Sequence, residues 1–116
     1  MKRYEESRIQ ICCKRWWNIQ YKNQRKLFHS IPNGGFRNPR EAAILVDEGE
    51  EAGAADTELH IARHGYHGLF VEFKTPTGRQ SAAQKEFQRQ VEAEGYKYII
   101  VRSVEQFISE IKAYLN

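Results

Sequence analysis

The segment from residue 56 to residue 74, DTELHIARHGYHGLFVEFK, organises the rest of the chain. Near its end, Leu69, Val71 and Phe73 alternate with other residues, and the charged residues Glu72 and Lys74 stand two positions apart. Residues two apart in a strand point to the same face, so a carboxylate and an ammonium emerge side by side from an apolar strand. Such a pair is costly to bury unless it is paired or bound to a metal, which makes both residues candidates for function.

The residues before this strand predict that it is half of an antiparallel hairpin. Residues 57–63 alternate well enough to form a strand, and the connection to Leu69 contains Gly65 and Gly68. Asp56 comes directly before the first of these strands and supplies a second carboxylate near Glu72.

Helix and strand signals alternate downstream of the hairpin. Ser81 is expected to cap a helix that places Gln84 at the position of a capping box, and Gly95 to end it. The apolar run 98–101 predicts a strand covered on both faces, and Ser103 is expected to cap a last helix.

Upstream, residues 4–26 predict a long helix. Its apolar residues recur at steps of three and four: Ile9, Cys12, Cys13, Trp16 and Ile19. This stripe places Trp16 in the core and leaves Trp17 exposed. Glu6 and Gln10 share a neighbouring face, where they either point together into a site or are exposed helix polars.

Between this helix and the hairpin, residues 27–31 predict a short strand and residues 32–35 a turn. Asn38, with Pro39 after it, is the expected cap of a second helix that Gly49 ends. The resulting order is α-β-α-β-β-α-β-α, which predicts an α/β fold with a mixed central β-sheet and helices on both faces.

The composition suits a single domain spanning residues 1–116. With 41% apolar residues, the chain is long enough to bury one core. No apolar run reaches the roughly 18 residues of a membrane helix, and the first residues lack an apolar signal core, so no membrane partner is expected. The adjacent cysteines Cys12 and Cys13 have no other partner in the chain, which favours a reducing, cytoplasmic setting.

Charge is distributed unevenly along the chain. Residues 1–40 contain ten lysines and arginines against Glu5 and Glu6, whereas residues 41–75 contain eight acids against Arg63 and Lys74. The basic first third either faces a polyanion such as nucleic acid or is a solvated helix face. Acids gathered near a polyanion site usually need a cation between them.

Phosphodiester hydrolysis is the chemistry that these residue types suit. It needs a metal that activates water and neutralises charge on the phosphate, and Mg²⁺ or Mn²⁺ prefers carboxylate oxygens and water. Asp56 and Glu72 offer the carboxylates, and the backbone carbonyl of Phe73 offers a further oxygen. Lys74 would orient the attacking water or stabilise the phosphate. His60, His64 and His67 also occur close together, but they divide between a strand and its hairpin, and a zinc site there is not expected.

The order of these residues resembles the virus-type replication-repair nuclease (VRR-NUC) branch of the PD-(D/E)xK nuclease superfamily. The shared stretches are Ile31-Pro32-Asn33-Gly34-Gly35, Gly53-Ala54-Ala55-Asp56, Val71-Glu72-Phe73-Lys74 and Gly78-Arg79-Gln80-Ser81-Ala82-Ala83-Gln84. The pair Glu6 and Gln10 also fits, which favours Glu6 over Glu5 as a further metal-site carboxylate. One departure is Ala55, where the superfamily has proline; this position shapes a turn and donates no ligand.

The resemblance implies a restriction-endonuclease-like core and a divalent-metal-dependent deoxyribonuclease. The expected site comprises Asp56, Glu72, Lys74, Gln84 and Glu6, with Mg²⁺ or Mn²⁺ as the cofactor. Gln84 would serve both the site and its capping box. Stand-alone members act on branched DNA such as Holliday junctions as homodimers, and the family suggests a bacterial or phage repair setting. A non-catalytic nucleic-acid-binding module is the alternative.

The residues expected to contact DNA flank this site. They are Asn33, Gly34, Gly35 and Arg37 in the turn, and Arg79 and Lys85 beside the third helix. Glycines allow a backbone to approach closely, and arginine pairs with phosphate. The alternative for the first four is that they form only a turn.

Overall fold

The computed structural model describes residues 4–33 and 38–116. The elements are α1 (Tyr4–Gln20), the 3₁₀ helix η1 (Lys22–Leu27), β1 (Phe28–Ser30), α2 (Pro39–Asp47), β2 (Thr57–Leu59), β3 (Leu69–Phe73), α3 (Ala82–Ala93), β4 (Lys97–Val101) and α4 (Val104–Leu115). The four strands form one sheet in the order β1-β2-β3-β4. The first two pairings are antiparallel and the last is parallel. The predicted order and the mixed sheet are confirmed, with η1 as an addition.

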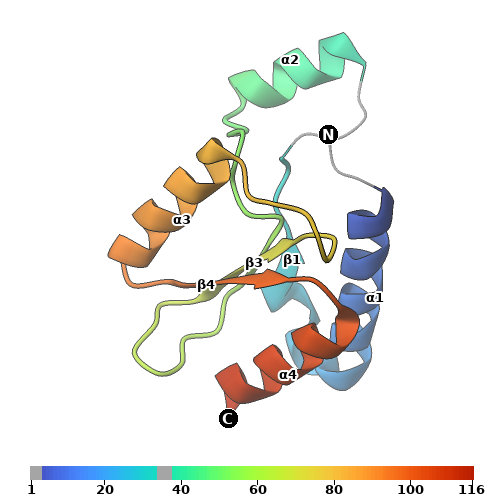
Figure 1. Ribbon diagram of the computed structural model, residues 1–116, viewed down its shortest axis with the longest axis vertical. Helices are drawn as coiled ribbons and strands as arrows, with labels where there is room; N and C mark the ends of the chain where they lie inside the picture. Colours follow the sequence, from blue (N-terminus) through green and yellow to red (C-terminus); the bar gives the residue numbers. More distant parts are fainter. Residues whose placement is uncertain (1–3, 34–37) are drawn as a thin grey trace.

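Helices cover both faces of the sheet, and the alternation within β3 explains which face each helix covers. Leu69, Val71 and Phe73 are buried in the core with residues of α1 and α4. Phe70 points to the other face, where its ring lies 5.3 Å from that of Phe87 in α3. Figure 1 shows α3 on one side of the sheet and α1 with α4 on the other.

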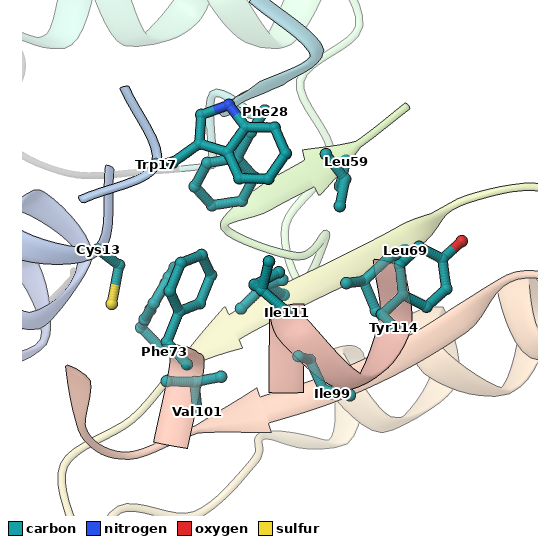
Figure 2. Close-up of a cluster of buried hydrophobic side chains, with 12 residues drawn as sticks. Cys13, Trp17, Phe28, Leu59, Leu69, Phe73, Ile99, Val101, Ile111 and Tyr114 are labelled. Atoms are coloured by element: carbon teal, nitrogen blue, oxygen red, sulfur yellow. The ribbon is translucent and has the colours of Figure 1, made fainter. Parts of the chain in front are cut away.

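Aromatic side chains dominate the core between the sheet, α1 and α4. The ring of Phe28 in β1 lies 5.7 Å from that of Trp17 in α1 and 5.4 Å from that of Phe107 in α4. Phe73 of β3 lies 6.1 Å from Phe107. Figure 2 shows Trp17 and Phe28 together on one side of this cluster and Phe73 on the other. The core therefore ties the first and last helices to both halves of the sheet.

The prediction that Trp17 is exposed is wrong. Its side chain is 0% exposed, whereas Ile19 is 66% exposed. The buried column of α1 consists of Cys13 and Trp17, which lie four residues apart and face Phe28. Ile9, Cys13 and Trp16 of the predicted stripe do lie in or against the core, so the stripe missed only Trp17, whose aromatic partner Phe28 lies on β1.

The first helix also ends earlier than predicted, at Gln20. Side chains of α1 reach backbone carbonyls beyond it: the Nε1 atom of Trp17 donates to Gln24 at 3.1 Å, and the Nζ atom of Lys14 donates to Arg25 at 2.9 Å. These contacts provide donors for two backbone carbonyls of η1 and hold this segment against α1, where the chain turns back into β1.

The second strand is shorter than the predicted 57–63, because it ends at Leu59. Two residues later, the carbonyl of Ile61 accepts a hydrogen bond from the Tyr114 hydroxyl of α4 at 2.6 Å. At Ile61, a hydrogen bond to α4 therefore takes the place of the strand pairing that was predicted to continue to residue 63.

The predicted helix caps are confirmed. The side chains of Asn38, Ser81 and Ser103 accept hydrogen bonds from the backbone three residues on, and Ser81 forms a full capping box with Gln84. Across the described part of the chain, every helix is too short or too polar to cross a bilayer.

The burial of Cys13 predicts a difference between the two thiols. Burial raises the pKa of the Cys13 thiol to about 12, whereas Cys12 is exposed. Since the thiolate is the reactive form, we expect a disulfide reagent at pH 8 to titrate one thiol in the native protein and two in denaturant. Cys12→Ser should abolish the native reaction and Cys13→Ser should preserve it. Equal native reactivity of both thiols would contradict the placement of α1.

Candidate functional site

The register between β2 and β3 brings Asp56 beside Glu72. Thr57 pairs with Val71, so continuing the antiparallel register by one residue places Asp56 opposite Glu72. The Oδ2 atom of Asp56 accepts a hydrogen bond from the backbone N–H of Phe73 at 2.7 Å. The Asp56 carboxylate is therefore held against the backbone between Glu72 and Lys74.

The two carboxylate oxygens of Glu72 have different surroundings, although its side chain is almost completely buried. Oε1 accepts hydrogen bonds from the Tyr98 hydroxyl and, at 3.0 Å, from the amide of Gln80. Oε2 has no hydrogen-bond partner among the described residues and lies 3.7 Å from Nζ of Lys74. One oxygen is thus anchored, and the other is left to interact with positive charge.

Tyr98 remains a donor to Glu72 over the ordinary pH range. Burial of its hydroxyl, together with the hydrogen bond to the Glu72 carboxylate, raises the pKa of Tyr98 well above its usual value. The phenol therefore stays protonated, and its proton is available to the carboxylate.

Gln84 joins the start of α3 to Lys74. Its Oε1 atom accepts hydrogen bonds from Nζ of Lys74 at 2.9 Å and from the backbone N–H of Ser81 at 2.8 Å. The Lys74 side chain is only 11% exposed, so the direction of its ammonium depends on this contact and on Glu72. Gln84 thus makes its capping contact and a contact to Lys74 with the same oxygen.

A second set of contacts shapes the loop between β3 and α3. The Nη1 atom of Arg102, directly after β4, donates to the carbonyls of Thr75 and Gly78, both at 2.7 Å. Gln80 then donates to Glu72 and, at 2.9 Å, to the Gln88 side chain. The loop is therefore fixed at both ends.

The loop before Asp56 packs closely against the start of α3. Gly53 has φ +88°, and a Cβ atom there would lie 2.7 Å from the carbonyl carbon of Ala83. Ala54 and Ala55 are buried after it. The side-chain amide of Asn33, which was expected to contact DNA, donates to the carbonyl of Ala54. This hydrogen bond connects the segment after β1 to the loop before Asp56.

Three further candidates lie among the described residues: Glu6, Arg79 and Lys85. Glu6 is half-buried on the face of α1 that also carries Cys13, and the hydrogen bonds of Glu72 go to Tyr98 and Gln80 rather than to α1. Arg79 and Lys85 are exposed beside the start of α3. Gly34, Gly35 and Arg37 lie outside the described residues.

Sequence reasoning missed three residues: Gln80, Tyr98 and Arg102. One signal was available, since Tyr98 is the hydroxyl-bearing residue at the start of an otherwise apolar run. Gln80 lies within the shared stretch that ends at Gln84, but no role was assigned to it. Arg102 carried no signal, because its partners depend on how the loop folds against β4.

Packing at Gly53 yields a test with a matched control. Gly53 and Gly49 both have positive φ, so alanine at either position costs roughly 1–2 kcal/mol of backbone strain. Of these two glycines, only Gly53 has atoms within 4 Å of an added Cβ, so overpacking should lower the free energy of unfolding of Gly53→Ala by a further 1–3 kcal/mol or so. Urea unfolding of both variants measures the difference, and equal losses would contradict the contact with Ala83.

Comparisons with known proteins agree with this architecture. No protein-family model matches the chain, and no curated protein matches it. A solved structure described as a VRR_NUC domain protein is similar, with a TM-score of 0.81 and 28% sequence identity, and the match covers 99% of this chain and 91% of that one. This match confirms the resemblance to VRR-NUC domain proteins that the motif residues predicted.

Proposed function

We propose that the chain is a divalent-metal-dependent deoxyribonuclease that cuts branched DNA. The observation that carries this proposal is the buried Oε2 atom of Glu72, which has no hydrogen-bond partner among the described residues. Glu72 lies on β3, which Lys74 follows directly, and the N–H of Phe73 in this strand donates to Asp56. A buried carboxylate oxygen without a donor needs positive charge near it; the Lys74 ammonium at 3.7 Å is one such charge, and a divalent cation would be a second.

The residues present suit Mg²⁺ or Mn²⁺. Asp56 and Glu72 would be the carboxylate ligands, with the Phe73 carbonyl and Glu6 as further oxygen donors. These hard oxygen ligands are the type that both cations prefer. When bound, such a cation supplies a nucleophilic water and offsets negative charge on the phosphate.

Lys74 would act on the phosphate or on the attacking water. Its ammonium is held between Glu72 and Gln84, so its position is set before DNA binds. A fixed positive charge at the reacting phosphate stabilises the charge that develops during hydrolysis. Gln84 acts through Lys74 and is therefore a positioning residue.

Arg79 and Lys85 would contact the DNA backbone. Both are exposed beside the start of α3, the helix whose cap contacts Lys74. We also keep the turn residues Asn33, Gly34, Gly35 and Arg37 as proposed DNA contacts. Action as a homodimer on four-way junctions is part of the proposal, because a two-fold dimer would present two sites to a junction that has two-fold character.

Removing the site residues should abolish cleavage. Asp56→Asn, Glu72→Gln and Lys74→Ala are each expected to lower the cleavage rate on the order of 10²-fold or more while leaving DNA binding nearly intact. Labelled four-way junction, splayed-arm, duplex and single-stranded DNA would be compared with Mg²⁺, Mn²⁺ or EDTA. Lys112→Ala, an exposed change on α4, is the matched lysine control.

Each pattern of cleavage has a distinct meaning. Symmetric nicks on the junction, together with a dimer mass in solution, support the proposed resolvase. Cutting of flaps or ends keeps the nuclease and removes the junction preference. Salt-sensitive binding without cleavage of any substrate would reject the enzyme in favour of a nucleic-acid-binding module.

Tyr98 tests whether the anchoring of Glu72 matters. Tyr98→Phe removes the hydroxyl donor and keeps the ring that packs 6.3 Å from Phe87. Losing a donor to a buried carboxylate costs about 1–3 kcal/mol, so Glu72 should be held less firmly. We expect slower cleavage and a higher metal concentration for half-maximal rate. Tyr96→Phe, which alters a tyrosine that packs on Phe70 instead, should change neither value.

A further inference from the structure

We infer that His29, Glu58 and His60 form a second cation site that binds a transition metal such as Zn²⁺. The Nε2 atoms of His29 and His60 lie 3.0 Å and 2.7 Å from the same atom, Oε1 of Glu58. One ligand atom from each residue lies within 4.8 Å of the others. Two imidazoles and a carboxylate therefore converge on one point.

The strand register produces this convergence. His29 of β1 pairs directly with Glu58 of β2, and His60 follows Glu58 by two residues, so all three side chains emerge on the same face. The two imidazole rings are stacked, with centroids 5.1 Å apart. The cluster is therefore built on paired backbone rather than on a loose loop.

The hydrogen bonding of His29 calls for a cation between Nε2 and the carboxylate. Its Nδ1 atom lies 2.9 Å from the backbone carbonyl of Lys26, and a carbonyl oxygen can only accept, so Nδ1 carries the proton. In the neutral ring, Nε2 then points a lone pair at a carboxylate oxygen. Either a second proton or a metal ion must lie between them. A backbone carbonyl that orients the distal nitrogen is the arrangement that metal-binding histidines usually have.

The ligand types favour a transition metal over magnesium. Two histidines and one carboxylate form a three-ligand set that suits Zn²⁺, with water at a fourth position, whereas Mg²⁺ prefers oxygen ligands. Tetrahedral ligands with bonds of about 2.0–2.1 Å stand roughly 3.3 Å apart, so each imidazole needs to move away from Glu58 by a few tenths of an ångström. The two imidazole nitrogens, which lie within 4.8 Å of each other, need to reach the same spacing. Side-chain exposures of 46% for His29 and 54% for His60 leave room for this movement and for ion entry.

This site is distinct from the proposed catalytic site. Glu58 pairs with Phe70, two residues along the sheet from Asp56 and Glu72. A cation bound there would crosslink β1 to β2, which are only three residues long each. Directly after β1, the N–H of Ile31 donates to the carbonyl of Asp56 at 2.8 Å. A cation that crosslinks β1 and β2 would therefore also stabilise the strand pairing next to Asp56.

Zinc calorimetry on protein without a histidine tag, in excess Mg²⁺, tests the inference without relying on cleavage. Magnesium occupies oxygen sites, so zinc reports on the cluster that contains nitrogen ligands. We expect one zinc ion per chain, with affinity reduced at least about 10-fold in His29→Gln and in His60→Gln. Zinc about 100-fold above its Kd should raise the Tm of the wild-type protein by roughly 5–10 °C and that of these variants by much less.

Two controls separate the cluster from other sites. His64→Asn changes an exposed histidine with φ +54°, a conformation that asparagine tolerates, and should bind zinc as the wild type does. Glu72→Gln should also bind zinc normally. The inference is overturned if the wild type binds no zinc, if the double variant His29→Gln/His60→Gln retains the affinity, or if Glu72→Gln loses it. Equal Tm values of the variants in EDTA would show that the substitutions leave the fold intact.

Discussion

A carboxylate without exposed surface, such as that of Glu72, is stable only where its surroundings replace the hydrogen bonds of water. Tyr98 and Gln80 provide two of these bonds, and the Lys74 ammonium provides the nearest positive charge. Each partner comes from a different element: β4, the loop before α3, and the end of β3. The burial of one side chain therefore requires these three segments to meet at one place, which is also the place where the proposed chemistry needs them.

The N-terminus of α3 is the second point on which the site depends. Gln84 uses one oxygen both to cap the helix and to hold Lys74, so helix initiation and lysine orientation are the same structural event. Gly53 lets the loop that precedes Asp56 approach the same turn at Ala83. The N-terminal end of α3 therefore helps to position both Asp56 and Lys74, although Asp56 precedes β2 and Lys74 follows β3.

One face of the sheet thus carries two clusters of different chemistry. Asp56 and Glu72 offer only oxygen atoms, and the inferred site at His29, Glu58 and His60 offers nitrogen as well. Hard divalent cations and transition metals would be sorted between them by ligand type rather than by distance. The separation of two residues along the strands would allow a cation at the inferred site to stabilise strand pairing while leaving the proposed catalytic carboxylates unchanged.

Structural features that depend on residues a few positions apart could be predicted from the amino-acid sequence alone. These include the caps at Asn38, Ser81 and Ser103, the alternation of β3, and the order of elements that indicated an α/β fold. Asp56, Glu72, Lys74 and Gln84 could be named because a short pattern carries them, and the tertiary structure brings all four together. The folded structure was needed to show that Trp17 is buried in the core beside the partly buried Trp16, that Tyr98 anchors Glu72, and that His29 meets Glu58. The partners in these last two contacts lie 26 and 29 residues apart, and local pattern cannot specify such pairs because strand register and helix packing select them.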